Sequence, residues 1–189
     1  MNRVPAIIEA VCFILNSLES ADKIHLVKLM YLADKYHVMN YGRTISGDNF
    51  LAFPHGPAGS RTMDVLKYDH RVLGEYLGYA KKMFKKGKGY QYEPGKKCNA
   101  DSLEMLSESD IEALEFSIKH FGKMDQWAVV DYTHGLPEWQ PFDRKFKEKQ
   151  IKQASIKTED VLCNPKDKYF SIPQEHINKS LEILRGTFD

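Results

Sequence analysis

The chain has few cysteines and none in a close pair. Cys12, Cys98 and Cys163 are spread along the 189 residues, and none belongs to a Cys-x-x-Cys motif. An odd, widely spaced set favours neither a disulfide framework nor a zinc knuckle. We therefore expect reduced thiols and a cytoplasmic location.

The sequence also lacks an excess of charge and a long hydrophobic run. Its 27 basic residues face 26 acidic ones, for a formal net charge of +1. This balance gives no global reason to expect binding to nucleic acids or membranes. Glu9 and Glu19 interrupt the first apolar segment, which is unlike a signal peptide, and no segment reaches the length needed to span a bilayer. We expect no membrane partner.

Familiar catalytic and nucleotide-binding loops are missing as well. The chain contains no Gly-x-Ser-x-Gly elbow and no local signature of an activated cysteine. It contains neither Gly-x-Gly-x-x-Gly nor Gly-x-x-x-x-Gly-Lys-Ser/Thr. We therefore predict no catalytic residue, no cofactor and no resident metal.

Helical periodicity is the main pattern that is present. Apolar residues recur at helical spacing after Pro5, and again from Asp22, a plausible N-cap, to Asn40, where they cover most faces. Gly42 is suited to end that second helix, which we place at the centre of a bundle. A turn at residues 46–48 and a short strand over 49–53 follow, and Gly56-Pro57 is expected to begin a helix ending near Tyr68.

The second half repeats this alternation of helices and turns. Residues 81–97 are expected to form a β-hairpin, and a loop is expected at 164–167. Further helices are expected from a capping box at Ser107 and Asp110 to Gly122, over 125–134, from Pro137 to about 149, and after Pro173. The prediction is a mainly α fold, a bundle of six or seven helices with one or two small antiparallel β-hairpins. Residues 1–144 would form the domain, with 145–189 as a helical C-terminal extension packed on it.

An ordered set of short motifs spans roughly residues 20 to 140. It consists of Leu29-Met30-Tyr31-Leu32-Ala33-Asp34, His37, Tyr41-Gly42, Ile45-Ser46-Gly47-Asp48, Gly56-Pro57, Thr133-His134 and Pro137-Glu138-Trp139. In order and spacing the set resembles the Panacea antitoxin domain of the SocA-like, phage-associated family. The chain departs from that pattern at Met124, where a small capping residue is expected.

The resemblance implies a function as well as a fold. It implies an antitoxin of a toxin-antitoxin system, which neutralises a cognate toxin by direct protein-protein binding and, in SocA-type members, also delivers it to a protease. Such a protein needs an interface that covers the toxin rather than a catalytic group of its own.

A polar and aromatic stripe runs along the predicted central helix. Its members are three or four residues apart and so share one face: Lys28, Tyr31, Asp34, His37 and Tyr41. One interpretation is structural, with Asp34 and His37 hydrogen-bonded to the turn at 42–48. The other is a partner-binding face with tyrosine anchors, extended by Asp48 and His55.

Two further interpretations concern histidines near this stripe. His55 would lie beside the helix start at Gly56-Pro57, where an imidazole meets free N–H groups. Alternatively, Asp34, His37 and His55, with His134 nearby, would bind a metal in a metal-dependent enzyme. His134 precedes Trp139, whose indole we expect to plug the bundle while its N–H finds a carbonyl.

The lysine-rich hairpin offers another function, that of a nucleic-acid-binding regulator. Lysines alternate with aromatic residues there, as in surfaces that bind phosphates and stack bases. The basic patch comprises Lys81, Lys82, Lys85, Lys86 and Lys88. Acidic residues follow at once and are expected to lie alongside and neutralise it: Asp101, Glu104, Glu108, Asp110, Glu112 and Glu115.

Overall fold

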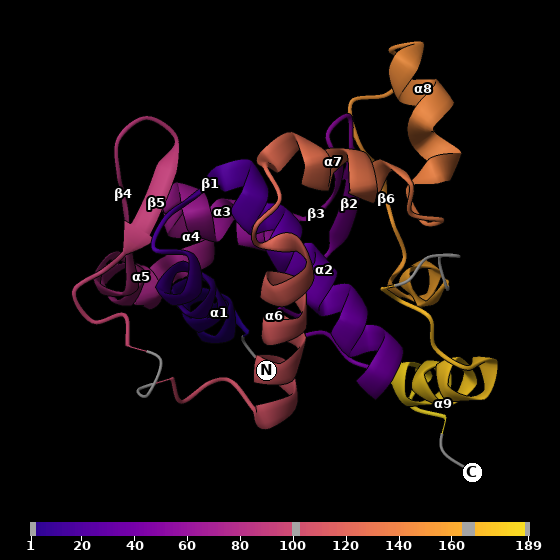
Figure 1. Cartoon of the computed structure of the whole chain (residues 1–189), viewed down its shortest axis with the longest axis horizontal. Coiled ribbons are helices and arrows are strands. Elements are labelled where there is room, and N and C mark those ends of the chain that lie inside the picture. The colour runs from indigo at the N-terminus through magenta and orange to yellow at the C-terminus, as the bar shows by residue number, and fades with distance from the viewer. Residues whose placement is uncertain (1–2, 100–102, 164–168, 188–189) are drawn as a thin grey trace.

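The computed structural model describes residues 3–99, 103–163 and 169–187, and shows a mainly helical protein with two small antiparallel sheets (Figure 1). The first half contains α1 (Val4–Leu18), β1 (Ala21–Asp22), α2 (Lys23–Tyr41), β2 (Phe50–Phe53), β3 (Gly56–Gly59), α3 (Ser60–Lys67), α4 (His70–Leu73), the 3-10 helix η1 (Gly74–Tyr76), α5 (Leu77–Met83), β4 (Phe84–Lys86) and β5 (Gln91–Pro94).

The second half is almost entirely helical. It contains α6 (Glu108–Phe121), α7 (Gln126–His134), the 3-10 helix η3 (Gln140–Phe142), α8 (Asp143–Lys147), β6 (Ala154–Ser155), the 3-10 helix η4 (Thr158–Leu162) and α9 (Gln174–Arg185). One sheet has the strand order β1-β5-β4 and the other β3-β2-β6. The predicted mainly α class with small β elements is confirmed.

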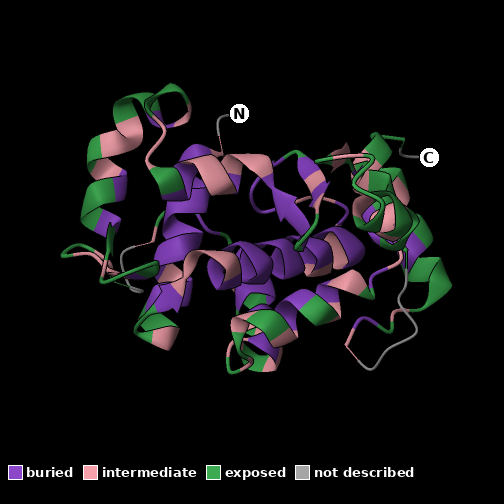
Figure 2. Ribbon diagram, turned by 90° about the horizontal axis from the view of Figure 1, so that it is seen from above, coloured by how far each residue is buried: buried purple, intermediate pink, exposed green. Residues whose placement is uncertain are grey.

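Helix α2 is the axis of the molecule, as its apolar sequence predicts. It crosses the centre of the structure with α1 and α6 against it and α9 near its C-terminal end (Figure 1). The Asp22 side chain caps it by accepting a hydrogen bond from the His25 N–H, and Gly42 ends it at a φ of 65°. Buried residues gather in the middle of the molecule, whereas exposed residues dominate its two ends (Figure 2).

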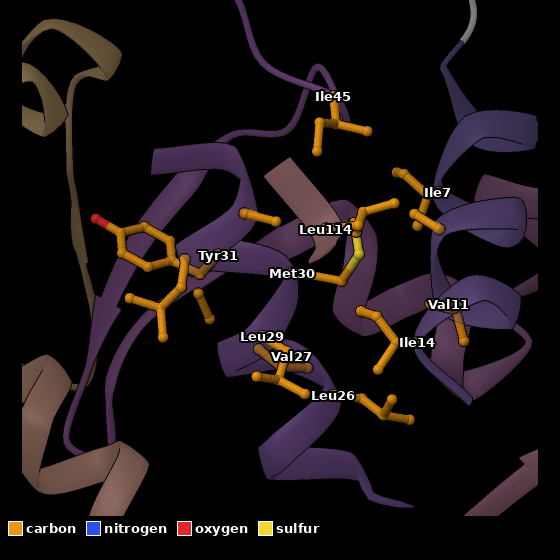
Figure 3. Packing of buried hydrophobic residues seen from close by; sticks show 14 of the residues in the cluster. Ile7, Val11, Ile14, Leu26, Val27, Leu29, Met30, Tyr31, Ile45 and Leu114 are labelled. Carbon is orange, nitrogen blue, oxygen red and sulfur yellow. The ribbon is translucent and has the colours of Figure 1, made fainter. Parts of the chain in front are cut away.

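The core forms where α2 meets its neighbours. Figure 3 shows Met30 of α2 between Ile14 of α1 and Leu114 of α6, while Tyr31 points its hydroxyl the opposite way. All four side chains are at most 1% exposed. Because α2 is covered on several sides, its hydrophobic pattern lacks the polar face of a surface helix.

Local capping signals set the later helix starts as predicted. Ser107 and Asp110 form the expected capping box of α6, which ends at Gly122. The Asp125 side chain caps α7 by accepting from the backbone of Trp127 and Ala128. The departure at Met124 therefore leaves the start of α7 intact, since the next residue supplies the cap.

The segment 56–59 corrects one prediction. Instead of beginning a helix, Gly56–Gly59 is strand β3, paired antiparallel with β2, and α3 begins only at Ser60. Pro57 fixes φ near −65°, a value that suits an extended chain as well as a first helical turn. His55 therefore lies in a hairpin turn rather than beside a helix N-terminus.

The cysteines correct another. Cys12 of α1 and Cys98, just after β5, form a disulfide with their Cα atoms 5.6 Å apart, while Cys163 is free and exposed. The expectation of unpaired thiols was wrong because the two residues are 86 positions apart in sequence. Only the packing of the β5 segment against α1 brings them together.

The C-terminal segment lies against the rest of the chain through specific contacts. Strand β6 joins the edge of β2, and the Ser180 hydroxyl of α9 donates to the Met39 carbonyl at 2.8 Å. The helix expected from Pro137 to about 149 is shorter, as η3 and α8 cover only 140–147 of it. The loop expected at 164–167 lies outside the described residues. Within the described ranges, no helix is both long enough and apolar enough to cross a bilayer.

Candidate functional site

Asp34 and His37 fasten α2 to the segment that follows it. The Asp34 carboxylate accepts hydrogen bonds from the backbone of Ile45 and Ser46 at 2.8 and 3.0 Å and from the Ser46 hydroxyl at 2.5 Å. His37 Nδ1 lies 2.8 Å from the Arg43 carbonyl oxygen. Burial raises the pKa of Asp34 to about 7 although these hydrogen bonds act to lower it, and burial lowers the pKa of His37. This is the structural interpretation of the two residues.

Asp48 has a similar internal role. Its two carboxylate oxygens accept hydrogen bonds from the backbone of Arg61 and Thr62, each at 2.7 Å. These N–H groups are among the unpaired donors of the first turn of α3, so Asp48 caps that helix from 12 or more residues away in sequence. Gly59 gives the carboxylate room, because a Cβ there would collide with it.

Lys35 and Glu138 form the largest polar contact that sequence reasoning missed. Lys35 Nζ donates to Glu138 Oε2 at 3.0 Å and to the carbonyls of Val161 and Cys163, and the Tyr31 hydroxyl donates to Glu138 Oε1 at 2.7 Å. Both charged side chains are fully buried. A lysine in a helix that is apolar on most faces was the available signal. Its partner lies in the Pro137-Glu138-Trp139 motif, but nothing in that motif indicated a pairing with a residue more than 100 positions away.

The residues predicted to bind a partner differ sharply in exposure. Lys28, Tyr31, Asp34, His37 and Asp48 are buried, whereas Tyr41 is partly exposed and His55 is exposed. The Tyr41 hydroxyl donates to Glu112 at 2.5 Å. Partner binding by this set stays a prediction, and direct contact in this conformation requires its exposed members.

A hollow opens at the N-terminal end of α2, over the β2–β3 hairpin. This Lys28 groove has a volume of about 260 Å³, and apolar side chains form most of its wall. It is lined by Lys23, Ile24, Val27, Lys28, Phe53, Pro54, His55, Gly56, Ala58 and Met63. It is a concave, mostly apolar site with a small number of polar groups, as is usual for binding pockets.

Lys28 is buried in the wall of this groove without a counter-charge. Its Nζ donates to the Pro57 carbonyl at 2.7 Å, and no carboxylate of the described residues forms an ion pair with it. Burial lowers its pKa to about 7. An ammonium has three N–H donors, and the described residues engage one of those of Lys28, in the bond to Pro57.

Gly56 brings the hairpin backbone close to Lys28 and α7. At its φ of 90°, a Cβ would lie 2.5 Å from Thr133 Oγ1 and 2.7 Å from Lys28 Nζ. His134, next to Thr133, stacks on Trp139, and its buried Nε2 lacks a hydrogen-bond partner among the described residues. Burial and the charge of Lys28 lower the pKa of His134. Trp139 Nε1 donates to the Phe53 carbonyl at 3.0 Å, as expected for an indole that plugs the bundle.

Residues 26–140 match the family described as Antitoxin SocA-like, Panacea domain, which is more than half of the chain. The chain belongs to this antitoxin family. The match includes α2 from Leu26 onward, both strands of the β2–β3 hairpin and Trp139. It therefore contains the lining of the Lys28 groove except for Lys23 and Ile24. No curated protein and no solved structure gave a significant match.

The Panacea domain also carries the basic patch at one end. β4 and β5 form the predicted hairpin, while Lys81 and Lys82 lie in the last turn of α5. All five lysines of the patch are exposed. Tyr90 at the hairpin tip is 88% exposed.

The expected neutralisation of that patch comes from another residue. Lys85 pairs with Glu93 of the same hairpin at 3.0 Å. Two of the downstream acidic residues that were expected alongside have other partners: Asp110 pairs with Arg43, and Glu112 accepts from Tyr36 and Tyr41. Glu104 lines a hollow together with Met83 and Lys97, at the base of the hairpin. Asp101 lies outside the described residues. Most of the patch therefore keeps its charge in solvent.

The alternative metal site is not assembled in this antitoxin structure. Within 3–99, 103–163 and 169–187, no group of three histidine, cysteine, aspartate or glutamate side chains is placed to hold an ion. Asp34 and His37 bond different parts of the 43–46 segment, and His55 packs against Trp127 with ring centres 5.7 Å apart. The three residues lack a common centre.

Proposed function

We propose that this chain is a neutralising antitoxin that binds a cognate toxin, encoded beside it, and holds the toxin inactive in a stable complex. The match of residues 26–140 to the SocA-like antitoxin family carries this proposal. Inhibition of this kind needs a surface that covers the toxin's working site and no chemistry by the antitoxin. We accordingly propose a non-enzymatic role.

Exposed features around the N-terminal end of α2 supply a suitable interface. The Lys28 groove is concave, and Trp127 nearby is 51% exposed. A large aromatic residue beside a pocket is typical of the centre of a protein interface. Two of the predicted partner-binding residues line this groove: Lys28, and His55, which packs against Trp127.

We propose a cytoplasmic location, where the toxin would be made and bound. Disulfides are uncommon in that compartment, so the Cys12–Cys98 bond makes the proposal testable. Because Cys12 is fully buried, cells are quenched in acid and the protein is denatured before alkylation and mass spectrometry. In the cytoplasm we expect part of the protein to carry reduced, labelled Cys12 and Cys98, although the fold holds the pair within bonding distance. Complete protection of the first two would place the protein in an oxidising compartment.

Delivery of the toxin to a protease is a second proposed step. The toxin's half-life in cells is expected to fall when the antitoxin is present and to recover when the responsible protease is absent. An unchanged half-life, with growth still rescued, would leave neutralisation by binding as the whole function.

The deciding experiment expresses the adjacent reading frame alone and together with this chain. We expect growth arrest by the neighbour alone, rescue on co-expression, and a complex that survives affinity purification and gel filtration. A frameshifted copy of this chain controls for the burden of expression. A harmless neighbour, or rescue without a complex, would contradict direct neutralisation.

Nucleic-acid binding by the lysine-rich hairpin is the second candidate. The observation in its favour is the exposed ring of Tyr90 beside exposed lysines, since single-stranded nucleic acids stack bases on aromatic rings within a basic surface. It predicts binding that weakens steeply with salt and weakens on Tyr90→Ala. Binding that is absent at low salt would remove this candidate.

A further inference from the structure

The Lys28 groove combines an apolar wall with a buried amine that has no ion-pair partner among the residues the structure describes. Lys28 is 3% exposed, yet its described hydrogen bond goes to a neutral carbonyl. A buried charge is costly unless it is paired. Elsewhere in this protein the rule is obeyed, because the fully buried Lys35 has Glu138. The missing element at Lys28 is an anion.

The groups around the groove strengthen the demand for negative charge. Lys23, at the same end of α2, also lines the groove, and burial together with the nearby charges of Lys67 and Lys86 lowers its pKa. The acidic residues nearby are engaged: Asp22 caps α2, and Asp64 pairs with Lys67 at 3.0 Å. The pKa values of both amines would therefore rise when a carboxylate binds beside them.

The size of the groove indicates what fits it. Its volume of about 260 Å³ is below the range of about 300–1,000 Å³ that is usual for small-molecule sites. The surface continues past it, since a second hollow shares Lys23 and Ile24 and is bordered by the exposed rings of Trp127 and Tyr90. One or two side chains of a larger partner, with further contacts outside, match this shape better than an isolated ligand.

We propose that the Lys28 groove binds a segment of the toxin in which an acidic side chain stands next to an apolar one. The carboxylate pairs with the ammonium groups of Lys28 and Lys23, and the apolar side chain packs between Ile24, Val27 and Met63. This inference rests on the proposed antitoxin function, and it names the part of the surface that performs it.

The first test measures affinity for the protein encoded by the adjacent reading frame. Lys28→Met removes the cation at similar length, and Ile24→Glu places a like charge in the path of the toxin's carboxylate. Each is expected to weaken binding by about tenfold or more, because the toxin's carboxylate is left buried without its partner. Lys179→Met in α9 is the matched control, since Lys179 is 68% exposed and α9 lies at the other end of α2. It should bind within about twofold of the wild type.

The second test identifies the partner group. A carbodiimide joins an amine directly to a carboxylate that contacts it. In the wild-type complex, we expect mass spectrometry to find Lys23 or Lys28 joined to an aspartate or glutamate side chain of the toxin, and Lys28→Met to lose the Lys28 product. Circular dichroism of the free variants verifies that they are folded.

The outcomes separate the inference from the proposed function. A wild-type complex that Lys28→Met and Ile24→Glu leave unchanged would overturn the groove as the binding site and leave neutralisation standing. A cross-link from the groove to the toxin's terminal carboxylate, or cross-links only from other lysines, would also overturn the inference. Failure of the wild-type protein to bind the neighbour would instead overturn the proposed function and the inference with it.

Discussion

Helix α2 carries two buried lysines, two helical turns apart, in opposite electrostatic situations. Lys35 donates to the Glu138 carboxylate and to two carbonyl groups. Lys28 donates to one carbonyl, and burial lowers its pKa to about 7. Compared with the ordinary value of 10.5, this corresponds to a cost of about 5 kcal/mol when the amine is charged.

This difference between Lys28 and Lys35 indicates different roles for the two ends of α2. Around Lys35, the polar groups of Tyr31, Asp34 and His37 are bonded within the protein, so this end holds the fold together. At Lys28 the protein tolerates an unpaired amine beside an open groove. The free-energy cost of burying a charged amine is offset by an ion pair at Lys35 and is not offset at Lys28. Such a difference is expected of a binding site, since strongly perturbed ionisable groups cluster at functional sites.

The largest expected effect comes from removing the cation of the buried Lys35–Glu138 pair, which tests the structural role assigned to Lys35. Lys35→Met leaves Glu138 buried with the Tyr31 hydroxyl and without its cation, and should lower the free energy of unfolding by about 4 to 5 kcal/mol. Urea denaturation measures this loss. The double variant Lys35→Met with Glu138→Leu should recover most of it, because a hydrophobic pair can replace a buried ion pair. A loss below about 1 kcal/mol would show that the pair contributes little.

The stability difference between Lys28→Met and the wild type should depend on pH. The pKa of Lys28 is lowered by folding, so the unfolded chain binds more protons between pH 7 and 10.5 and the wild type gains stability across that window. Relative to the wild type, the variant should lose about 4 kcal/mol between pH 6 and pH 10. Lys23 is present in both proteins. Removal of Lys28 relieves part of the lowering of the His134 pKa, which affects only the acid end of this range. A constant difference would mean that Lys28 stays charged in the folded state.

At pH 6 the same variant should be more stable than the wild type, by about 2 kcal/mol. Removing the buried charge gains more than the unpaired Pro57 carbonyl costs. The expected change in the free energy of unfolding has the opposite sign from that of Lys35→Met. Urea denaturation of the two variants therefore compares the two lysines directly. A destabilised Lys28→Met would place Lys28 with the structural residues.

A smaller loss of stability is expected at Asp48, whose hydrogen bonds, like those of Lys35, stay within the protein. Asp48→Ala removes the acceptors for Arg61 and Thr62 at the start of α3 and should cost about 2 kcal/mol, as expected for a helix cap. Asp48→Asn, which keeps one acceptor oxygen, should cost less. Equal losses for the two variants would indicate that charge rather than capping is responsible.

Tyr41 gives the smallest expected effect. Its hydroxyl bonds Glu112 at a partly exposed position, so Tyr41→Phe should change the free energy of unfolding by about 0.5 kcal/mol or less. The loss should shrink further in high salt. A loss above about 2 kcal/mol would extend the structural network to the end of α2.

The sequence predicted the elements whose signals are local. Asp22, Ser107 and Gly42 each act within a few residues, and they correctly marked the ends of α2 and the start of α6. Gly56-Pro57 shows the limit, because the same dipeptide fits the first turn of a helix and an extended strand. Pairing with β2, which the local pattern does not contain, decided between them.

For the site, the sequence located the stripe on α2 but could not rank its members. Asp34 is bonded to Ser46, which is nearby in sequence. Lys28 is bonded to Pro57 of β3, a segment that was predicted to begin a helix. Lys23 and Trp127 were missed, since neither lies in a motif. Their importance comes from the groove and the hollow beside it.

The sequence alone determined the helical class, the helix caps, the hairpin of β4 and β5, and membership of an antitoxin family. Hydrophobic period and capping chemistry operate over a few residues and can be read without a structure. Tertiary structure alone decided the Cys12–Cys98 bond, the pairing of Lys35 with Glu138 and the isolation of Lys28. The two cysteines are 86 positions apart in sequence, and Lys35 and Glu138 are more than 100 positions apart. Only the packing of the folded chain decides whether such distant residues come into contact.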